Sequence, residues 1–199
     1  MITHIIAFLV MLNPFALFLY MSPIMDDLTH KNFIKVLFNA SLISFGIFFI
    51  FLLSGDFLFQ RLLQINFESF RIFGGIIIFS LAFLFIVKGQ KAMVQMKESL
   101  SDLASEIALP FMIGAGTISL TILMSNELQL LGGTAALAII LIINFVAIMI
   151  LKAIRDDLSK KQKKIAFDKF MGILLRLNGF FIGAIGINMV VVGILNIFC

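Results

Sequence analysis

Six long apolar runs constrain the fold of this 199-residue chain more than any other feature of its sequence. They cover residues 2–24, 33–53, 70–87, 107–124, 133–151 and 174–198. Most approach the roughly 20 apolar residues that a helix needs to cross a bilayer core. The runs are continuous rather than alternating, so we expect helices and not the strands of a membrane barrel. The sequence therefore predicts an all-α, polytopic membrane protein with six transmembrane helices in one membrane domain over residues 1–199.

The overall composition supports this class. Hydrophobic residues make up 61% of the chain and charged residues 13%, whereas ordinary soluble domains hold about 45–50% and about 25%. A chain of this length has too little polar surface to cover so much apolar material in water. This composition excludes a soluble enzyme, a disordered protein and a disulfide-stapled secreted domain, and the single cysteine, Cys199, has no partner within the sequence.

The positions of the basic residues predict the orientation. Thirteen of the fifteen Lys and Arg residues fall in or beside the first, third and fifth connections, and the other two are Arg61 and Arg71. The positive-inside rule places those three connections in the cytoplasm and both termini outside, in the periplasm or the extracellular space. The basic run at 160–164 also resembles a patch for lipid or nucleic acid. Topology alone explains this run, so we predict the lipid bilayer as a partner and no nucleic acid.

Two further segments bear on the topology. The first apolar run lacks the basic residues that precede the apolar core of a signal peptide, so we expect a retained helix. The connection at 54–69 mixes apolar with charged residues. This mixture favours an interfacial or re-entrant amphipathic piece, and an ordinary surface loop is the alternative.

Short motifs recur in the same order in the two halves of the chain. Leu12-Asn13-Pro14-Phe15 resembles Ala108-Leu109-Pro110-Phe111, and Phe70-Arg71-Ile72-Phe73-Gly74 resembles Leu175-Arg176-Leu177-Asn178-Gly179. A duplicated unit of three spans must insert upside down the second time. We therefore predict two inverted repeats, about 1–98 and about 99–199, with interrupted first helices. Such repeats are typical of secondary transporters.

The first helix of each repeat carries residues that break helices. Pro14 lacks an N–H and disturbs the helix at Asn13, and Pro110 does the same ahead of two glycines. A helix that resumes after a break exposes N–H groups and a positive dipole end, which can hold a carboxylate. We therefore predict that the breaks at Asn13-Pro14 and Gly114–Gly116 meet near the midplane and form a small polar site; proline kinks with glycines for close packing are the alternative. The candidate substrate-binding residues are Asn13, Pro14, Pro110, Gly114, Gly116, Thr117 and Ser119.

At these residues the sequence resembles the MarC family of six-span bacterial inner-membrane proteins, which includes neutral amino acid transporters. The matching runs are Asn13-Pro14-Phe15-Ala16, Pro110-Phe111-Met112-Ile113-Gly114-Ala115-Gly116 and, most specifically, Phe70-Arg71-Ile72-Phe73-Gly74-Gly75. The family pattern has Asp where this chain has Asn13, Gly at Ala16, and Pro at Leu19 and Ala115. The resemblance implies movement of amino acids across the inner membrane. The departures indicate weaker helix breaks and an altered preference for substrate or ion.

Other polar residues stand out against the apolar runs. Arg71 and Arg176 each precede a glycine by three residues, Gly74 and Gly179. We predict a gating or structural role for these four residues, with snorkelling of the arginines to the interface as the alternative. Four asparagines within the runs are expected mostly to form interhelical hydrogen bonds. They are Asn39, Asn144, Asn178 and Asn188.

The predicted function is a secondary transporter or exporter of small neutral amino acids or related zwitterions. A small-molecule substrate is the expected partner, and a coupling cation and a second copy of the chain are candidates. The alternative is a non-transporting membrane scaffold or accessory protein. We predict no enzyme activity, metal or cofactor, because the sequence holds no catalytic set, no metal-ligand cluster and no phosphate-binding loop.

Overall fold

All secondary structure in the described part of the chain is helical, which confirms the predicted all-α class. The computed structural model describes residues 2–25, 28–55, 57, 61, 64–89, 107–158 and 161–198. Its elements are α1 (Ile2–Leu12), α2 (Pro14–Met25), α3 (His30–Ser54), α4 (Phe67–Lys88), the π-helix η3 (Ile107–Met112), α6 (Ala115–Glu127), α7 (Leu130–Asp157) and α8 (Lys161–Phe198). Six of the sixteen residues of the predicted amphipathic connection at 54–69 lie outside the described residues, as does the predicted boundary between the repeats.

Local capping explains where the peripheral helices begin and end. The Thr29 side chain accepts a hydrogen bond from the Asn32 backbone N–H at the start of α3, and Asn66 caps α4 in the same way. Both helices end at a glycine with positive φ, Gly55 at 47° and Gly89 at 57°. Such a conformation strains most other residues, so these glycines stop the helices sharply.

In the described part of the chain, five helical segments are long and apolar enough to cross a membrane: Ile2–Leu19, His30–Ser54, Phe67–Lys88, Leu130–Asp157 and Gln162–Phe198. The predicted span at 107–124 is instead divided between η3 and α6, and neither element alone has that length. Six spans were predicted, and five are found by length and composition. The last helix begins at Lys161, well before the predicted residue 174, because the basic stretch that precedes the apolar run is also helical.

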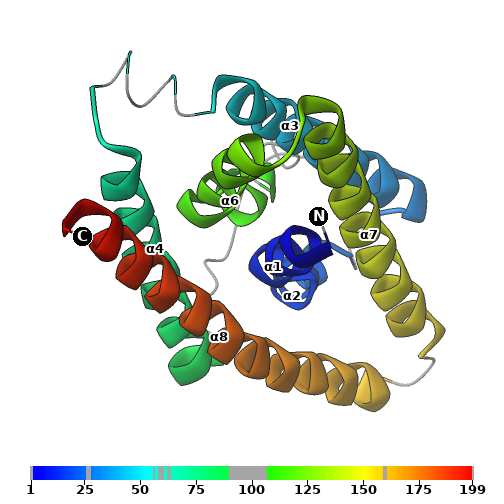
Figure 1. The fold of residues 1–199 in the computed structure, drawn as a ribbon. Coiled ribbons are helices and arrows are strands. Elements are labelled where there is room, and N and C mark those ends of the chain that lie inside the picture. The colour runs from blue at the N-terminus through cyan, green and yellow to red at the C-terminus, as the bar shows by residue number, and fades with distance from the viewer. Residues whose placement is uncertain are drawn as a thin grey trace.

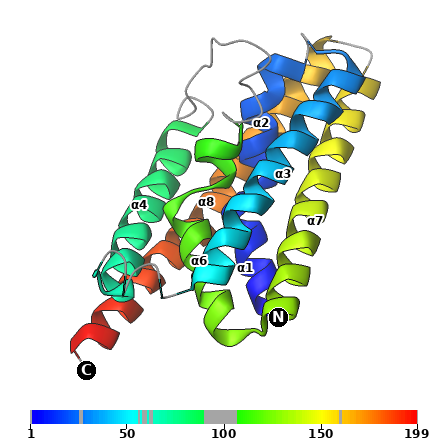
Figure 2. The same ribbon diagram turned by 90° about the horizontal axis from the view of Figure 1, so that it is seen from above.

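The helical segments run alternately between the two ends of the molecule, so both termini lie at the same end (Figure 2). The broken segments, α1–α2 and η3–α6, occupy the centre, and α3, α7, α8 and α4 surround them (Figure 1). The largest core cluster collects residues from the central segments and from α3, α7 and α8. Phe8 and Phe48 pack edge to face at 5.2 Å within it. The central position of the broken segments places any polar group at a break inside the protein rather than in lipid.

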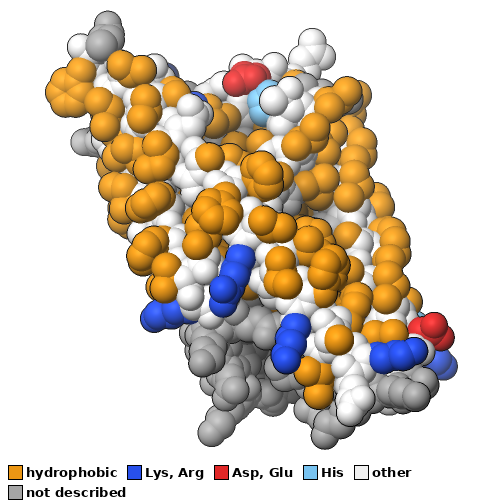
Figure 3. All heavy atoms as spheres, turned by 90° about the horizontal axis from the view of Figure 1, so that it is seen from below, with side chains coloured by type: hydrophobic (Ala, Val, Ile, Leu, Met, Phe, Trp, Pro, Cys, Tyr) orange, Lys and Arg blue, Asp and Glu red, His pale blue; other side chains and the backbone are white. Residues whose placement is uncertain are grey.

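The outer surface matches a protein surrounded by lipid. A broad belt of hydrophobic side chains crosses the molecule, and Lys and Arg side chains gather along one edge of it (Figure 3). Large hydrophobic residues of several helices are more than half exposed, among them Phe38 of α3, Ile142 of α7 and Phe181 of α8. In water such a surface would aggregate, whereas in a bilayer it is solvated by acyl chains.

The α4–α8 pair is the tightest helix crossing. A Cβ added to Gly75 would lie 2.6 Å from the Gly186 carbonyl oxygen, and one added to Gly186 would lie 2.8 Å from the Gly75 carbonyl oxygen. The two backbones therefore touch at a point where only glycine fits. Small residues at such crossings are the usual means of bringing membrane helices together.

Buried positions recur one hundred residues apart. Each of the six buried residues of α3 has a buried counterpart in α7. The pairs are Phe33 and Gly133, Leu37 and Leu137, Ala40 and Ile140, Ser44 and Asn144, Phe48 and Ile148, and Leu52 and Lys152. The same spacing relates the central segments, where Leu12 and Met112 are both buried immediately before a break. The predicted motif alignment, Pro14 with Pro110, has a spacing four residues shorter.

Candidate functional site

The first helix break is a sharp turn at Asn13, as predicted from Pro14. Asn13 adopts a φ of 48°, which Asn tolerates better than most residues. The Asn13 N–H donates to the Leu9 carbonyl at 3.1 Å, and the Asn13 carbonyl accepts from the Leu17 N–H at 3.1 Å. The Asn13 Oδ1 accepts from the Ala16 N–H at 3.1 Å and so caps α2. Pro14 opens α2, where its missing N–H costs nothing.

The second break lies between Met112 and Ala115. Pro110 lies inside the π-helix η3, where the Ile113 N–H reaches back five residues to the Ala108 carbonyl at 2.9 Å. A π-turn is one way in which a membrane helix accommodates a proline. Gly114 then adopts an extended conformation and α6 begins.

The Thr117 hydroxyl closes this second break. Its Oγ1 accepts from the Gly114 N–H at 2.9 Å, and its proton lies within reach of the Met112 carbonyl at 3.1 Å and the Gly114 carbonyl at 3.0 Å. The residue is 4% exposed. The Gly114 N–H is therefore satisfied by its own chain in this conformation.

The two breaks lie side by side. A Cβ added to Gly116 would lie 2.1 Å from Ile78 Cδ1 and 2.2 Å from Met11 Cε. Met11 is two residues before Asn13, and Gly116 is two residues after Gly114. The first turn of α6 thus meets α1 next to its break, and the missing side chain of Gly116 is the space that Met11 and Ile78 fill.

Several buried polar atoms have no hydrogen-bond partner. Among the described residues they are His4 Nδ1, Asn13 Nδ2 at the first break, Ser119 Oγ in α6 and both amide atoms of Asn144 in α7. Ser119 and Asn144 are 0% exposed and Asn13 is 2% exposed. A buried polar group without a partner is costly in an apolar interior, so each such atom calls for an explanation.

The asparagines predicted to bond between helices divide into different kinds. The Asn178 amide donates to the Val10 carbonyl at 3.2 Å, which ties α8 to α1 and confirms the prediction for this residue. Asn39 and Asn188 are exposed. For Asn144 the prediction is wrong, because its side chain bonds to no described residue. Its position one hundred residues after Ser44, in the middle of an apolar run, was the signal that could have singled it out.

The two predicted gating arginines lie at opposite ends of α4. Arg71 pairs with Glu68 at 3.0 Å and lies over the Phe67 ring, and Glu68 also accepts from the Asn196 amide at 3.0 Å. Arg176 is exposed and lies at the far end of α4, with its Nε 2.9 Å from the position of a Cβ added to Gly89. Both side chains thus lie where α4 approaches α8.

The two predicted glycines beside these arginines belong to the same helix pair. Gly74 is buried in α4. A Cβ added to Gly179 would lie 3.0 Å from Ile86 Cγ1 and 3.3 Å from the Ala82 carbonyl. Their present environment is close helix packing.

The basic end of the molecule also holds two ion pairs in which the cation is buried. Arg155 of α7 pairs with Asp168 of α8 at 3.1 Å, with 7% of the arginine side chain exposed. Lys152 pairs with Asp156 and lies over the Phe33 ring at 5.4 Å. These contacts join α7 to α8 and to the start of α3.

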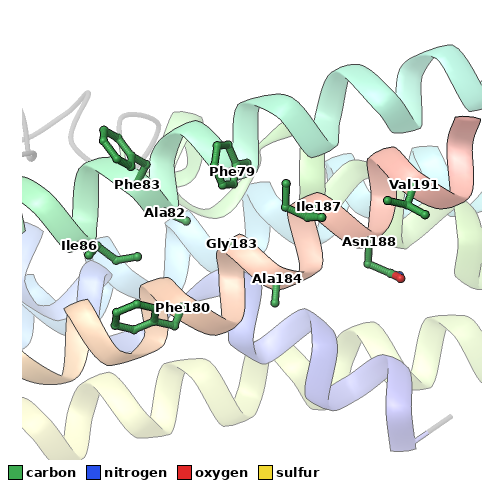
Figure 4. A pocket seen from close by; sticks show the side chains of 10 residues that line it. All are labelled: Phe79, Ala82, Phe83, Ile86, Phe180, Gly183, Ala184, Ile187, Asn188 and Val191. Atoms are coloured by element: carbon green, nitrogen blue, oxygen red, sulfur yellow. The ribbon is translucent and has the colours of Figure 1, made fainter.

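An open groove of about 510 Å³ lies elsewhere, on the outer face of α4 and α8 (Figure 4). Phe83, Phe180 and Ile187 line it and are exposed, so it faces the surroundings of the protein rather than the breaks. Asn188 supplies its polar side chain. In the described residues, no three His, Cys, Asp or Glu side chains come together in a way that could hold a metal ion.

Apolar helices of spanning length around two central, interrupted segments define a multi-pass membrane protein. A family model described as "MarC family integral membrane protein" matches residues 1–198, so the chain belongs to the MarC family, as its motifs predicted. A membrane protein of the UPF0056 group from Pyrococcus horikoshii is 23% identical over 190 residues, covering 93% of this chain and 88% of the relative. Another from Aquifex aeolicus is 26% identical over 201 residues, covering 96% and 91%. No solved structure matches the chain significantly.

Proposed function

We propose that this protein is a secondary transporter or exporter of small neutral amino acids or related zwitterions in the cytoplasmic (inner) membrane. The observation that carries the proposal is the junction of two helix breaks at the centre of the bundle, with buried polar atoms left unpartnered beside it. Interrupted helices that meet between two halves are how many secondary transporters build a substrate site.

The proposed architecture is two inverted repeats of three spans, with η3–α6 completing the sixth. Three observations support it. Buried positions recur one hundred residues apart in α3 and α7. The corresponding helices α3 and α7 run in opposite directions, as do α4 and α8 (Figure 2). The two central segments break at equivalent positions, Asn13 and Ile113–Gly114. The edge rich in Lys and Arg would face the cytoplasm, which leaves both termini outside.

Substrate binding would exchange internal hydrogen bonds for bonds to the ligand. A substrate carboxylate would replace the Thr117 hydroxyl at the Gly114 N–H, where the dipole of α6 adds partial positive charge. Ser119 Oγ and Asn13 Nδ2 would gain partners from the same ligand. Withdrawal of Met11 from Gly116 would open the space for it. Rocking of one half against the other would then expose the junction to each side in turn.

Uptake into liposomes tests this proposal. Purified protein would be reconstituted and assayed with radiolabelled glycine, alanine and serine, and we expect saturable uptake of at least one of them. Ser119→Ala should lower that uptake without lowering stability, because it removes a hydroxyl that has no hydrogen-bond partner among the described residues. Ser80→Ala is the matched control, since Ser80 Oγ bonds only to the Ile76 carbonyl on an exposed face. Equal uptake by empty liposomes would contradict the proposal.

A non-transporting scaffold is the second candidate. The closure of the second break by Thr117 and the filling of the Gly116 space by Met11 and Ile78 favour it, because the junction is already packed. A scaffold predicts no stabilisation by amino acids. A transporter predicts about 2.7 kcal/mol at a ligand concentration one hundred times the dissociation constant. A thermal-shift screen of the detergent-solubilised protein separates the two.

A further inference from the structure

Asn144 is the most completely buried amide without a partner in the described part of the chain. It lies midway along α7, is 0% exposed, and has neither its oxygen nor its nitrogen bonded to any described residue. A packing role alone would be filled better by Leu, which has a similar volume and no polar atoms to satisfy. The amide therefore points to a bonding partner that is not part of the chain.

The recurrence of buried positions one hundred residues apart predicts that Asn144 lies beside the first break. Its counterpart Ser44 is buried in α3, where its Oγ donates to the Ala40 carbonyl at 2.8 Å and lies 3.5 Å from Met112 Sδ. Met112 is the last residue of η3, directly before the second break. The residue equivalent to Met112 is Leu12, which ends α1 next to Asn13. Helix α7 packs against both α1 and α2, as the correspondence requires.

The polar atoms available there match one chemical class of ligand. Asn13 Oδ1 is already used to cap α2, so Asn13 offers only N–H donors from Nδ2. Asn144 offers an acceptor oxygen and two further donors. The surrounding stretches 2–25, 36–54, 107–126 and 128–151 contain no Asp, Glu, Lys or Arg. A ligand of net charge zero that both donates and accepts hydrogen bonds therefore fits, whereas a lone anion or cation would enter without a counter-charge.

We propose that Asn144 is a substrate-binding residue which, together with Asn13, recognises a zwitterionic amino acid. The Asn144 Oδ1 accepts from the substrate ammonium group, and the amide N–H groups of Asn13 and Asn144 donate to its carboxylate. This assignment rests on the proposed transport function and adds to it a residue and a requirement that the substrate carry both charged groups.

The test is isothermal titration calorimetry on purified full-length protein with L-alanine, and with lactate and ethylamine as probes that each lack one charged group. The wild type should bind L-alanine and neither fragment. Asn144→Leu should weaken L-alanine binding at least tenfold while the thermal midpoint stays equal or rises. Asn39→Leu is the control, because Asn39 is an exposed asparagine on α3, and it should leave the affinity within threefold.

A second variant separates a loss of binding from a loss of folding. Asn144→Ser recreates the Ser44 arrangement, in which a hydroxyl bonds to the carbonyl four residues earlier, and it should fold and bind at least tenfold more weakly. Unchanged affinity in either folded variant would overturn the role of Asn144 and leave the transport proposal standing. Wild-type binding of lactate or ethylamine as tight as that of L-alanine would overturn the zwitterion requirement. Absence of wild-type binding across glycine, alanine and serine would overturn both proposals.

Discussion

Replacing Thr117 by Val tests whether one hydroxyl holds the second helix break in its observed shape. Valine keeps the size and branching of threonine but removes Oγ1. In the structure this atom accepts from the Gly114 N–H at 2.9 Å and donates toward the Met112 and Gly114 carbonyls at 3.1 Å and 3.0 Å. The change therefore deletes the bonds that bridge η3 and α6 and adds no new contact.

The expected cost can be worked out from those bonds. Loss of the donated bond removes about 0.5–1.5 kcal/mol, and an N–H left without its acceptor costs about 1–3 kcal/mol when buried. Because Gly114 is only half-buried, we expect the lower part of the combined range, about 2 kcal/mol of unfolding free energy.

Unfolding by SDS in mixed micelles, followed by far-ultraviolet circular dichroism, measures this change; the chain has no tryptophan to report it by fluorescence. Thr121→Val is the matched control. Thr121 lies one turn later in α6, is equally buried, and donates only to the Thr117 carbonyl within the same helix at 2.7 Å. Its loss should cost about 0.5 kcal/mol or less, because that carbonyl already takes part in the helix ladder. Equal effects of the two substitutions would refute the closure of the break by Thr117.

Two further predictions concern packing and topology. Gly75→Val should destabilise the protein by about 1–3 kcal/mol in the same assay, because its Cβ would lie 2.6 Å from the Gly186 carbonyl oxygen. Gly46→Val is the control and should cost less than about 1 kcal/mol, because a Cβ at Gly46 meets nothing within 4 Å. Similar costs for the two substitutions would contradict the backbone contact between α4 and α8. A membrane-impermeant maleimide applied to intact spheroplasts should label the sole cysteine of the wild type, Cys199. It should not label the cysteine of Lys164→Cys in a Cys199→Ser background. The opposite pattern would show that the proposed orientation is reversed.

The class of fold could be predicted from sequence because it depends on local quantities. Apolar runs of near-spanning length demand helices whatever their neighbours are, and the structure agrees. The number of spans was harder to predict from the sequence than the class of fold. A hydropathy pattern averages over residues 107–124 and does not register that the backbone changes from π-helix to an extended residue and then to α-helix within that run. The break divides one apolar run into two elements that are each too short to span alone.

The positions of the breaks were predictable to within a few residues for a similar reason. Pro14 acts on its immediate neighbour, so Asn13 was identified correctly. In the second segment the break was predicted at Gly114–Gly116, and the structure has it at Gly114, after a π-turn that contains Pro110. Glycine is a poor helix former, which favours a break there rather than at the proline itself.

The partners of the buried polar residues could not be predicted, because they depend on contacts between distant parts of the chain. Asn178 and Asn144 look alike in sequence, each an amide within an apolar run. One donates to a carbonyl 168 residues away, and the other has no partner in the described residues. Only the packing of α8 against α1, and of α7 against the first break, separates a structural asparagine from a candidate binding residue.

The exchange of the family's aspartate for Asn13 takes on a definite meaning once the cap is known. One side-chain oxygen is needed to accept the Ala16 N–H, and Asp and Asn supply it equally well. The exchange therefore keeps the first break intact, while the second carboxylate oxygen becomes an N–H donor, Nδ2, which is buried and unpartnered here. It also removes the negative charge that the family pattern places at the breaks. Under the proposed function, a coupling cation at this position would lose its counter-ion, whereas a substrate carboxylate would gain a donor.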